Sequence, residues 1–167
     1  MKKSYAVVVL CVFVTSCETT MPLTIAGEVE NERTFTYGDL NSLPAQVDDV
    51  AREVEGRQGH GVRLRSLIEA AGRKSGATHA TLASTDGKFT ASVPLDDILD
   101  AVLVYQLNGE PLPEQFGGPI RFLIPDAAAC HAGGADTCAN VKFLGRIELT
   151  RGKVEDSRDK KDQTPHG

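Results

Sequence analysis

Short runs of alternating apolar and polar residues follow one another along most of the chain, and they predict a protein built mainly of β-strands. The strongest pattern covers residues 77–93, where two alternating runs flank Asp86-Gly87, a dipeptide favoured in tight hairpin turns. A second turn is expected at Asn108-Gly109. The other predicted strands are 23–29, 34–37, 101–107, 119–125 and 141–150.

Helical spacing is clear in one place only. Apolar residues recur near a helical period from Val62 to Ala71, and Gly72 stands where a helix would end. Single helical turns are predicted at 37–43 and 94–99, whereas 46–58 is polar, acidic and left unassigned. Several strands with a few short helices between them predict an α+β domain with a mixed, mostly antiparallel sheet.

The N-terminus predicts an export signal. Lys2 and Lys3 precede an apolar run at 6–14, which is far shorter than the roughly 20 residues of a membrane-spanning helix. The run ends in Val14-Thr15-Ser16-Cys17, which resembles the lipobox of bacterial lipoproteins. We therefore expect a signal peptide at 1–16, cleavage before Cys17, and lipidation of that cysteine. An ordinary secretory signal with a chance cysteine is the alternative.

The rest of the chain divides into a tether at 17–22, one domain at 23–151 and a charged tail at 152–167. About 130 residues suit a single domain. The tail is poor in apolar residues, so we expect it to be disordered. A lipid on Cys17 predicts a location in the bacterial cell envelope, facing the periplasm, and Glu18 favours the outer membrane by resemblance to enterobacterial sorting.

Charge argues against a nucleic-acid partner. The net charge is −5, and no basic stripe is interleaved with aromatic residues, as phosphate-backbone binding would require.

Four cysteines are present, and they separate by position. Cys11 leaves with the signal, and Cys17 takes the lipid. Cys130 and Cys138 remain as an even pair in an exported chain, where oxidising conditions favour a disulfide. A zinc site with His131 is the alternative, but it lacks a fourth ligand.

Six short motifs occur in an order that resembles the molybdopterin-binding domain of the sulfite oxidase family. Together they span about 125 residues, and none is specific by itself. The motifs are Leu23-Thr24-Ile25-Ala26-Gly27 with the turn before Pro44, Gly61-Val62-Arg63-Leu64 opening the helix to Gly72, Ser84-Thr85-Asp86-Gly87, Asn108-Gly109-Glu110-Pro111-Leu112-Pro113, Gly117-Gly118-Pro119-Ile120-Arg121 and Val141-Lys142-Phe143-Leu144.

This resemblance implies the family's α+β fold and a glycine-lined cleft that holds the anionic pterin. It assigns cofactor-binding roles to Asn108, Gly118, Arg121 and Lys142. Arginine and lysine beside glycine turns suit a phosphate group. The same two cations can also serve as surface or salt-bridge residues that hold a loop.

The chain departs from the family at the metal. Catalytic members bind molybdenum through the pterin sulfurs and one cysteine thiolate, which precedes the helix that opens at Gly61-Val62. The matching stretch, 45–60, contains no cysteine, and hard ligands do not replace a soft thiolate without changing the metal chemistry. His60 lies in this stretch and is a candidate metal ligand, although a histidine in a glycine loop is more often simply solvated. The signal carries Lys2-Lys3 in place of the twin arginine that exports folded, cofactor-loaded proteins.

These features lead to three hypotheses. In the first, the domain carries no cofactor and no catalytic residue, and it is a membrane-anchored binding module for a small anion or an envelope protein. In the second, it is an oxidoreductase that retains molybdopterin with an unusual metal ligand. In the third, it is a partner of a redox protein and acts through its surface near the Cys130–Cys138 loop.

Overall fold

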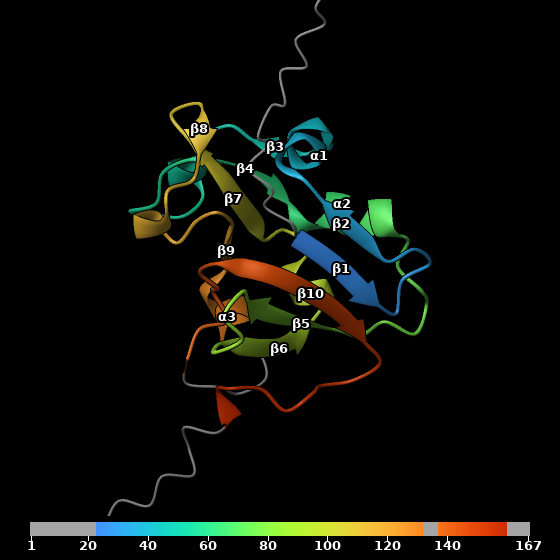
Figure 1. Ribbon diagram of the computed structural model, residues 1–167. Helices are drawn as coiled ribbons and strands as arrows, with labels where there is room; N and C mark the ends of the chain where they lie inside the picture. The colour runs from blue at the N-terminus through green and yellow to red at the C-terminus, as the bar shows by residue number, and fades with distance from the viewer. Residues whose placement is uncertain (1–22, 132–136, 160–167) are drawn as a thin grey trace, which may run out of the picture.

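Two β-sheets form the framework of the protein (Figure 1). The structure is a computed structural model, and it describes residues 23–131 and 137–159. The strands in this part of the chain are β1 (Leu23–Gly27), β2 (Arg33–Phe35), β3 (Gln46–Val47), β4 (His60–Arg63), β5 (His79–Ser84), β6 (Thr90–Pro94), β7 (Val102–Leu107), β8 (Glu110–Pro111), β9 (Arg121–Leu123) and β10 (Leu144–Thr150).

The first sheet has the order β2-β1-β10-β5-β6, and its strands follow one another downwards in Figure 1, with β2 uppermost and β6 lowest. Its central pair, β1 and β10, is parallel, with Ile25 opposite Ile147. All the other pairs in this sheet are antiparallel, and β5 and β6 form the hairpin that closes at Asp86-Gly87. This arrangement agrees with the mixed, mostly antiparallel sheet expected from the sequence.

The second sheet has the order β3-β4-β7-β8, and β9 pairs with β7. All of its pairs are antiparallel. The turn between β7 and β8 has Asn108 at φ 53° and Gly109 at φ 84°. A type I′ turn needs positive φ at both central residues, which explains why Asn-Gly stands here.

The helices are short. α1 (Tyr37–Ser42) begins with a capping box, in which the Thr36 hydroxyl accepts from the Asp39 amide and the Asp39 carboxylate accepts from the Thr36 amide. α2 (Leu64–Ala71) ends at Gly72, whose φ of 75° is left-handed. The remaining helices are α3 (Ala127–Cys130) and the 3₁₀ turns η1 (Val50–Arg52), η2 (Asp96–Ile98) and η3 (Glu114–Phe116).

Strand β7 is buried on both faces. Leu103 and Tyr105 pack into the main core between the two sheets and α2. Val102 and Val104 point the other way, into a smaller cluster with residues of β3, η1 and β9. Double-sided burial explains the continuous apolar run that predicted this strand.

The predicted elements are confirmed in kind, but several bounds differ; β9 and β10, for example, begin at Arg121 and Leu144 instead of 119 and 141. The helix expected from Val62 begins at Leu64, because 60–63 pairs with β7 instead. A Cβ at Gly61 would lie 2.7 Å from the Leu103 carbonyl oxygen, so glycine lets the two strands approach. The unassigned stretch 46–58 contains β3 and η1, and α3 was not anticipated.

The expectation of a disordered tail from residue 152 is corrected for 152–159. These residues pack along β6, and the side chains of Asp156 and Arg158 are 0% and 1% exposed. The prediction was based on the low apolar content of the segment, whereas Asp156 and Arg158 bind one another and the edge of β6. Residues 160–167 lie outside the described residues, as do the predicted signal peptide, Cys11, Cys17 and the tether. None of the described helices is long and apolar enough to cross a membrane.

Gly27 offers a test of the close approach between β1 and β10. Its φ is 85°, and an added Cβ would lie 2.2 Å from the Leu149 carbonyl oxygen. We expect Gly27→Ala to lower the free energy of unfolding by about 1–2 kcal/mol for the left-handed backbone and by about 1–3 kcal/mol more for the overlap. Urea denaturation measures the loss. Gly87→Ala is the matched control, since its φ is 67° and its Cβ would meet nothing within 4 Å. Equal losses in the two variants would contradict the steric argument.

Candidate functional site

A pocket of about 370 Å³ opens between the 51–58 segment and strands β7 and β9. Its floor is apolar, and its polar groups come from two arginines and one glutamine. Apolar lining with a few polar groups is typical of small-molecule sites. The lining residues are Ala51, Gly56, Arg57, Gln58, Val104, Leu107, Leu112, Phe116, Arg121 and Leu123.

Arg121 is the first residue of β9 and is held opposite Val104 of β7. One of its guanidinium nitrogens, Nη1, donates to the Phe116 carbonyl oxygen at 2.9 Å. Its Nε is buried and has no hydrogen-bond partner among the described residues. A buried N–H without an acceptor is costly in a folded protein, so this nitrogen marks a place where an acceptor from a ligand would be stabilised.

The pocket is electropositive. Arg121 and Arg57 both line it, and neither guanidinium has a carboxylate within ion-pair distance in the part of the chain that the structure describes. Burial and the nearby charge of Arg57 both lower the pKa of Arg121 from its usual value. The lowered pKa means that burial and the neighbouring guanidinium both disfavour the charged form of Arg121.

A second pocket, of about 500 Å³, adjoins the first through Ala51, Gln58 and Leu107, which line both. His60 and Asp48 lie on its wall, with His60 Nδ1 3.6 Å from an Asp48 carboxylate oxygen.

The tautomer of His60 follows from its neighbours. The Gln46 amide nitrogen donates to the carbonyl oxygens of Leu40 and Leu43, at 2.8 and 2.7 Å. This orientation leaves Gln46 Oε1 as an acceptor for His60 Nε2 at 2.9 Å and for the Tyr105 hydroxyl at 2.8 Å. Nε2 therefore carries a proton, and Nδ1 faces the carboxylate of Asp48.

The four residues predicted to bind the cofactor do not share one pocket. Arg121 lines the first pocket and Asn108 the adjoining one, whereas Lys142 lines a third hollow beside the β5–β6 turn. Lys142 and Arg121 nevertheless flank the same glycine, since a Cβ on Gly117 would lie 2.9 Å from Lys142 Cγ and 3.4 Å from Arg121 Cδ. Their roles in binding stay predictions.

Gly118 is buried and serves close packing. A Cβ at this position would lie 1.8 Å from the Leu112 carbonyl oxygen, so only glycine lets the two segments meet. Arg57 was not predicted as a site residue, because it lies in a polar stretch that contains no motif. Its proximity to Arg121 arises only when η1 packs against β7.

The thiols do not supply a molybdenum ligand. Cys130 and Cys138 form a disulfide, as expected, with Cα atoms 4.8 Å apart. Both sulfurs are thereby used, which also contradicts the zinc alternative. Within 23–131 and 137–159, no group of three or more His, Cys, Asp or Glu side chains is arranged to hold a metal ion. Among the described residues, Arg57 and Arg121 offer donors of the kind that an anionic group takes, whereas no free cysteine thiolate is present.

Comparison with known proteins places this site in a family. Residues 51–157 match the model of the oxidoreductase molybdopterin binding domain, which is more than half of the chain, so the protein belongs to this family. The fold agrees. Sulfane dehydrogenase SoxCD from Paracoccus pantotrophus superposes with a TM-score of 0.58 at 24% identity, covering 80% of this chain and 39% of that one.

The relatives in sequence are larger proteins. Mitochondrial sulfite oxidase of Rattus norvegicus is 30% identical over 100 residues, which are 53% of this chain and 17% of that protein. An uncharacterized oxidoreductase of Bacillus subtilis, YuiH, is 40% identical over 67 residues, 39% of this chain and 33% of that protein. An inducible nitrate reductase of Glycine max is 35% identical over 104 residues, 54% of this chain and 11% of that protein. The chain thus spans a third or less of the length of these relatives.

Tyr105 gives a pH-dependent test of the polar chain behind the site. Burial and the neighbouring Tyr37 raise the pKa of Tyr105 to about 12. A raised pKa means that the folded protein holds the proton longer than the unfolded chain, so this contribution is full below about pH 10 and is lost as the pH rises towards 12. Spectrophotometric titration should show one late tyrosine step, which Tyr105→Phe removes. The result would be contradicted if the late step survives in that variant.

Proposed function

We propose that this protein is a binding module of the bacterial envelope, which holds a phosphate-like or oxyanion group in the pocket of Arg57 and Arg121. The lipid on Cys17 would keep it at a membrane. The family membership supports a molybdopterin-type, oxidoreductase-like domain. The anchor and the binding role are the parts that go beyond it.

One observation carries the proposal. Arg121 Nε is buried and without a partner in a pocket that contains a second guanidinium and no opposing carboxylate among the described residues. Arginine is suited to phosphate and oxyanions because its planar donors bond two oxygens at once. The apolar floor of the pocket would strengthen such bonds by excluding water.

Binding is favoured over redox catalysis because of the donor set. The 45–60 segment offers Asp48, Asp49 and His60 near the pocket, which are oxygen and nitrogen ligands, and no sulfur. Molybdenum held by a thiolate needs a soft ligand that this segment does not contain. No redox step is therefore assigned to these residues.

Anion binding is tested by thermal shift with inorganic phosphate and sulfate. At an anion concentration of about 100 Kd, binding stabilises the folded protein by about 2.7 kcal/mol and raises Tm. Removing a charged hydrogen bond worth about 1.5–3 kcal/mol weakens affinity by roughly ten- to a hundredfold, so at the same anion concentration Arg121→Gln should reduce the stabilisation to about 0.4–1.4 kcal/mol and shrink the rise in Tm.

Lys142→Ala tests how much Lys142 contributes to anion binding compared with Arg121, the other cation that flanks Gly117. We expect a smaller loss than for Arg121→Gln, because Lys142 is exposed and lies outside the Arg57 pocket. The matched control is Arg146→Gln, because Arg146 is an exposed arginine on β10 that forms ion pairs with Glu32 and Glu148. An unchanged anion-induced shift in Arg121→Gln would sink the proposal.

A second function stays open because the chain belongs to a molybdopterin-binding family. In this alternative the domain keeps the pterin and an unusual metal ligand, for which His60 is the candidate. Elemental analysis and oxidised-pterin fluorescence of protein extracted from its own membrane decide between the two. We expect neither molybdenum nor pterin; about one of each per chain would overturn the binding-module proposal. Mass spectrometry of the same preparation tests the anchor, since an unmodified Cys17 would contradict it.

A further inference from the structure

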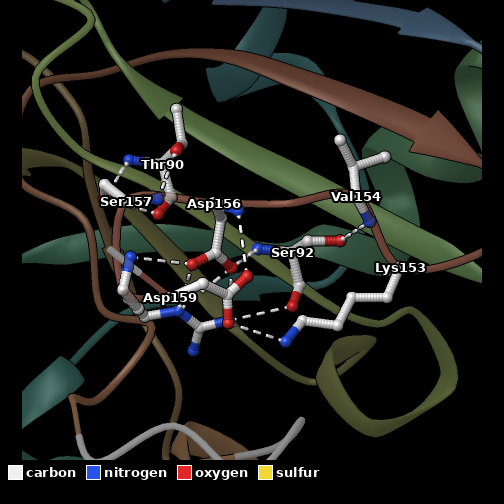
Figure 2. A network of polar contacts seen from close by, with 8 residues as sticks. Thr90, Ser92, Lys153, Val154, Asp156, Ser157 and Asp159 are labelled. Atoms are coloured by element: carbon white, nitrogen blue, oxygen red, sulfur yellow. Dashed lines mark hydrogen bonds and ion pairs between the residues drawn. The ribbon is translucent and has the colours of Figure 1, made fainter. Parts of the chain in front are cut away.

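The C-terminal segment 153–159, called the strap below, lies along the outer edge of β6, the last strand of the first sheet (Figure 2). Hydrogen bonding shows which groups of β6 face outwards. The Ser84 amide bonds the Phe89 carbonyl, and the Leu95 amide bonds the Thr78 carbonyl. Because antiparallel pairing alternates along a strand, Ala91 and Val93 turn towards β5, while Thr90 and Ser92 present their backbone groups to the outside.

Side chains of the strap satisfy all four of these outward groups. The Ser157 hydroxyl accepts from the Thr90 amide at 2.9 Å and donates to the Thr90 carbonyl at 2.8 Å. The Asp156 carboxylate accepts from the Ser92 amide at 2.5 Å, and Arg158 Nη2 donates to the Ser92 carbonyl at 2.9 Å. Two consecutive outward residues of β6 are thus bonded as a neighbouring strand would bond them, although no strand is there.

The strand also bonds back to the strap. Ser92 Oγ accepts from the Val154 amide at 3.0 Å, and Thr90 Oγ1 accepts from the Ser157 amide at 2.9 Å. The strap is fixed internally as well, since Lys153 Nζ donates to Asp159 at 2.9 Å and the Asp156 amide donates to the other oxygen of Asp159 at 3.1 Å. Contacts within the strap thus add to those that it makes with the strand.

The central ion pair of the strap has a large desolvation cost. Asp156 and Arg158 are almost fully buried, and Arg158 Nη1 has no hydrogen-bond partner in the part of the chain that the structure describes. Removing two charges from water has a desolvation cost, and the attraction between them offsets that cost only in part. Such pairs therefore contribute little to stability. The pair nevertheless matches one outward amide and one outward carbonyl, which an apolar side chain cannot do. This match points to a role in occupying the edge.

We propose that the strap is a built-in block on the β6 edge, which prevents the first sheet from pairing with a second copy of this chain. An open strand edge presents unpaired N–H and C=O groups and is a template for pairing. If the strap dissociates from β6, the backbone groups of Thr90 and Ser92 present two hydrogen-bond donors and two acceptors. A second copy presents the same four groups, so the two β6 edges pair antiparallel about a two-fold axis.

Acid is not the release signal near neutral pH. Burial alone would raise the pKa of Asp156, but hydrogen bonds from Arg158 and from the Ser92 amide outweigh it and hold the pKa below its usual value. Lys153 and Asp159 are the other charged groups of the strap that bond within it. A depressed pKa keeps the strap charged in mild acid, and its contribution is lost only as the pH falls below about 4. Release therefore needs substitution, cleavage or displacement.

Two substitutions in the full chain test the block, with all proteins compared in the same detergent. Asp156→Ala removes the acceptor of the Ser92 amide, and Ser157→Ala removes both bonds to Thr90. Glu155→Ala is the matched control, because Glu155 is the exposed neighbour in the same segment. Hydrogen exchange of single amides by NMR, and sedimentation at rising protein concentration, are the two measurements.

We expect at least tenfold faster exchange at Ser92 in Asp156→Ala and at Thr90 in Ser157→Ala, with Ala91 and Val93 still protected by β5. We also expect concentration-dependent dimers in Asp156→Ala, and monomers in the wild type and in Glu155→Ala. Unchanged exchange at Thr90 and Ser92 would overturn the proposal, as would faster exchange in a protein that stays monomeric. If Asp156→Ala also exposes Ala91 and Val93, the milder Ser157→Ala decides by the same two readouts.

Discussion

The packing around strand β7 shapes both the core of the protein and the pocket. It is buried on both faces, so one set of its side chains fills the main core and the other requires a second apolar layer. That layer is made by β3 and η1, which therefore pack against the strand and bring the polar 51–60 segment to its end. Because β9 pairs with β7, Arg121 is held at the same place. The pocket is a consequence of covering the outer face of one strand.

The electrostatics of the pocket follow from this packing. Two guanidinium groups meet at its wall, and Arg121 is partly desolvated by the loops that cover β7. The protein as a whole is acidic, with a net charge of −5. Arg57 and Arg121 thus form a local positive region on an acidic protein.

The β6 edge of the first sheet is covered by side chains of the C-terminal segment and not by another described strand. β10 and β1 pair in parallel at the centre, and β5 and β6 add an antiparallel hairpin whose last strand would be open. A strand edge needs partners for its backbone groups wherever water does not supply them. The C-terminal segment supplies them from side chains, which allows a highly charged sequence to complete a sheet without adopting β-structure.

Local chemistry in the sequence determined much of this protein. Asp86-Gly87 and Asn108-Gly109 specified their turns, Gly72 ended α2, and Cys130 could pair only with Cys138 among the cysteines of the expected mature domain. These features depend on a few neighbouring residues, so a pattern reveals them. The family resemblance, carried by ordered motifs, likewise predicted the α+β fold and Arg121 as a site residue.

Tertiary structure alone decided where the charges meet. Arg57 and Arg121 are far apart in the chain, and nothing in either segment predicts that β7 and β9 bring them to one pocket. The sequence predicted that Asp156 and Arg158 lie in a disordered tail. Composition shows how much charge a segment carries, but not which backbone groups those charges bind. The role of Gly118 in binding stays a prediction, and the structure adds that the Leu112 carbonyl beside it leaves room only for glycine. In each case the deciding contact joins residues whose proximity arises only from the packing of the two sheets.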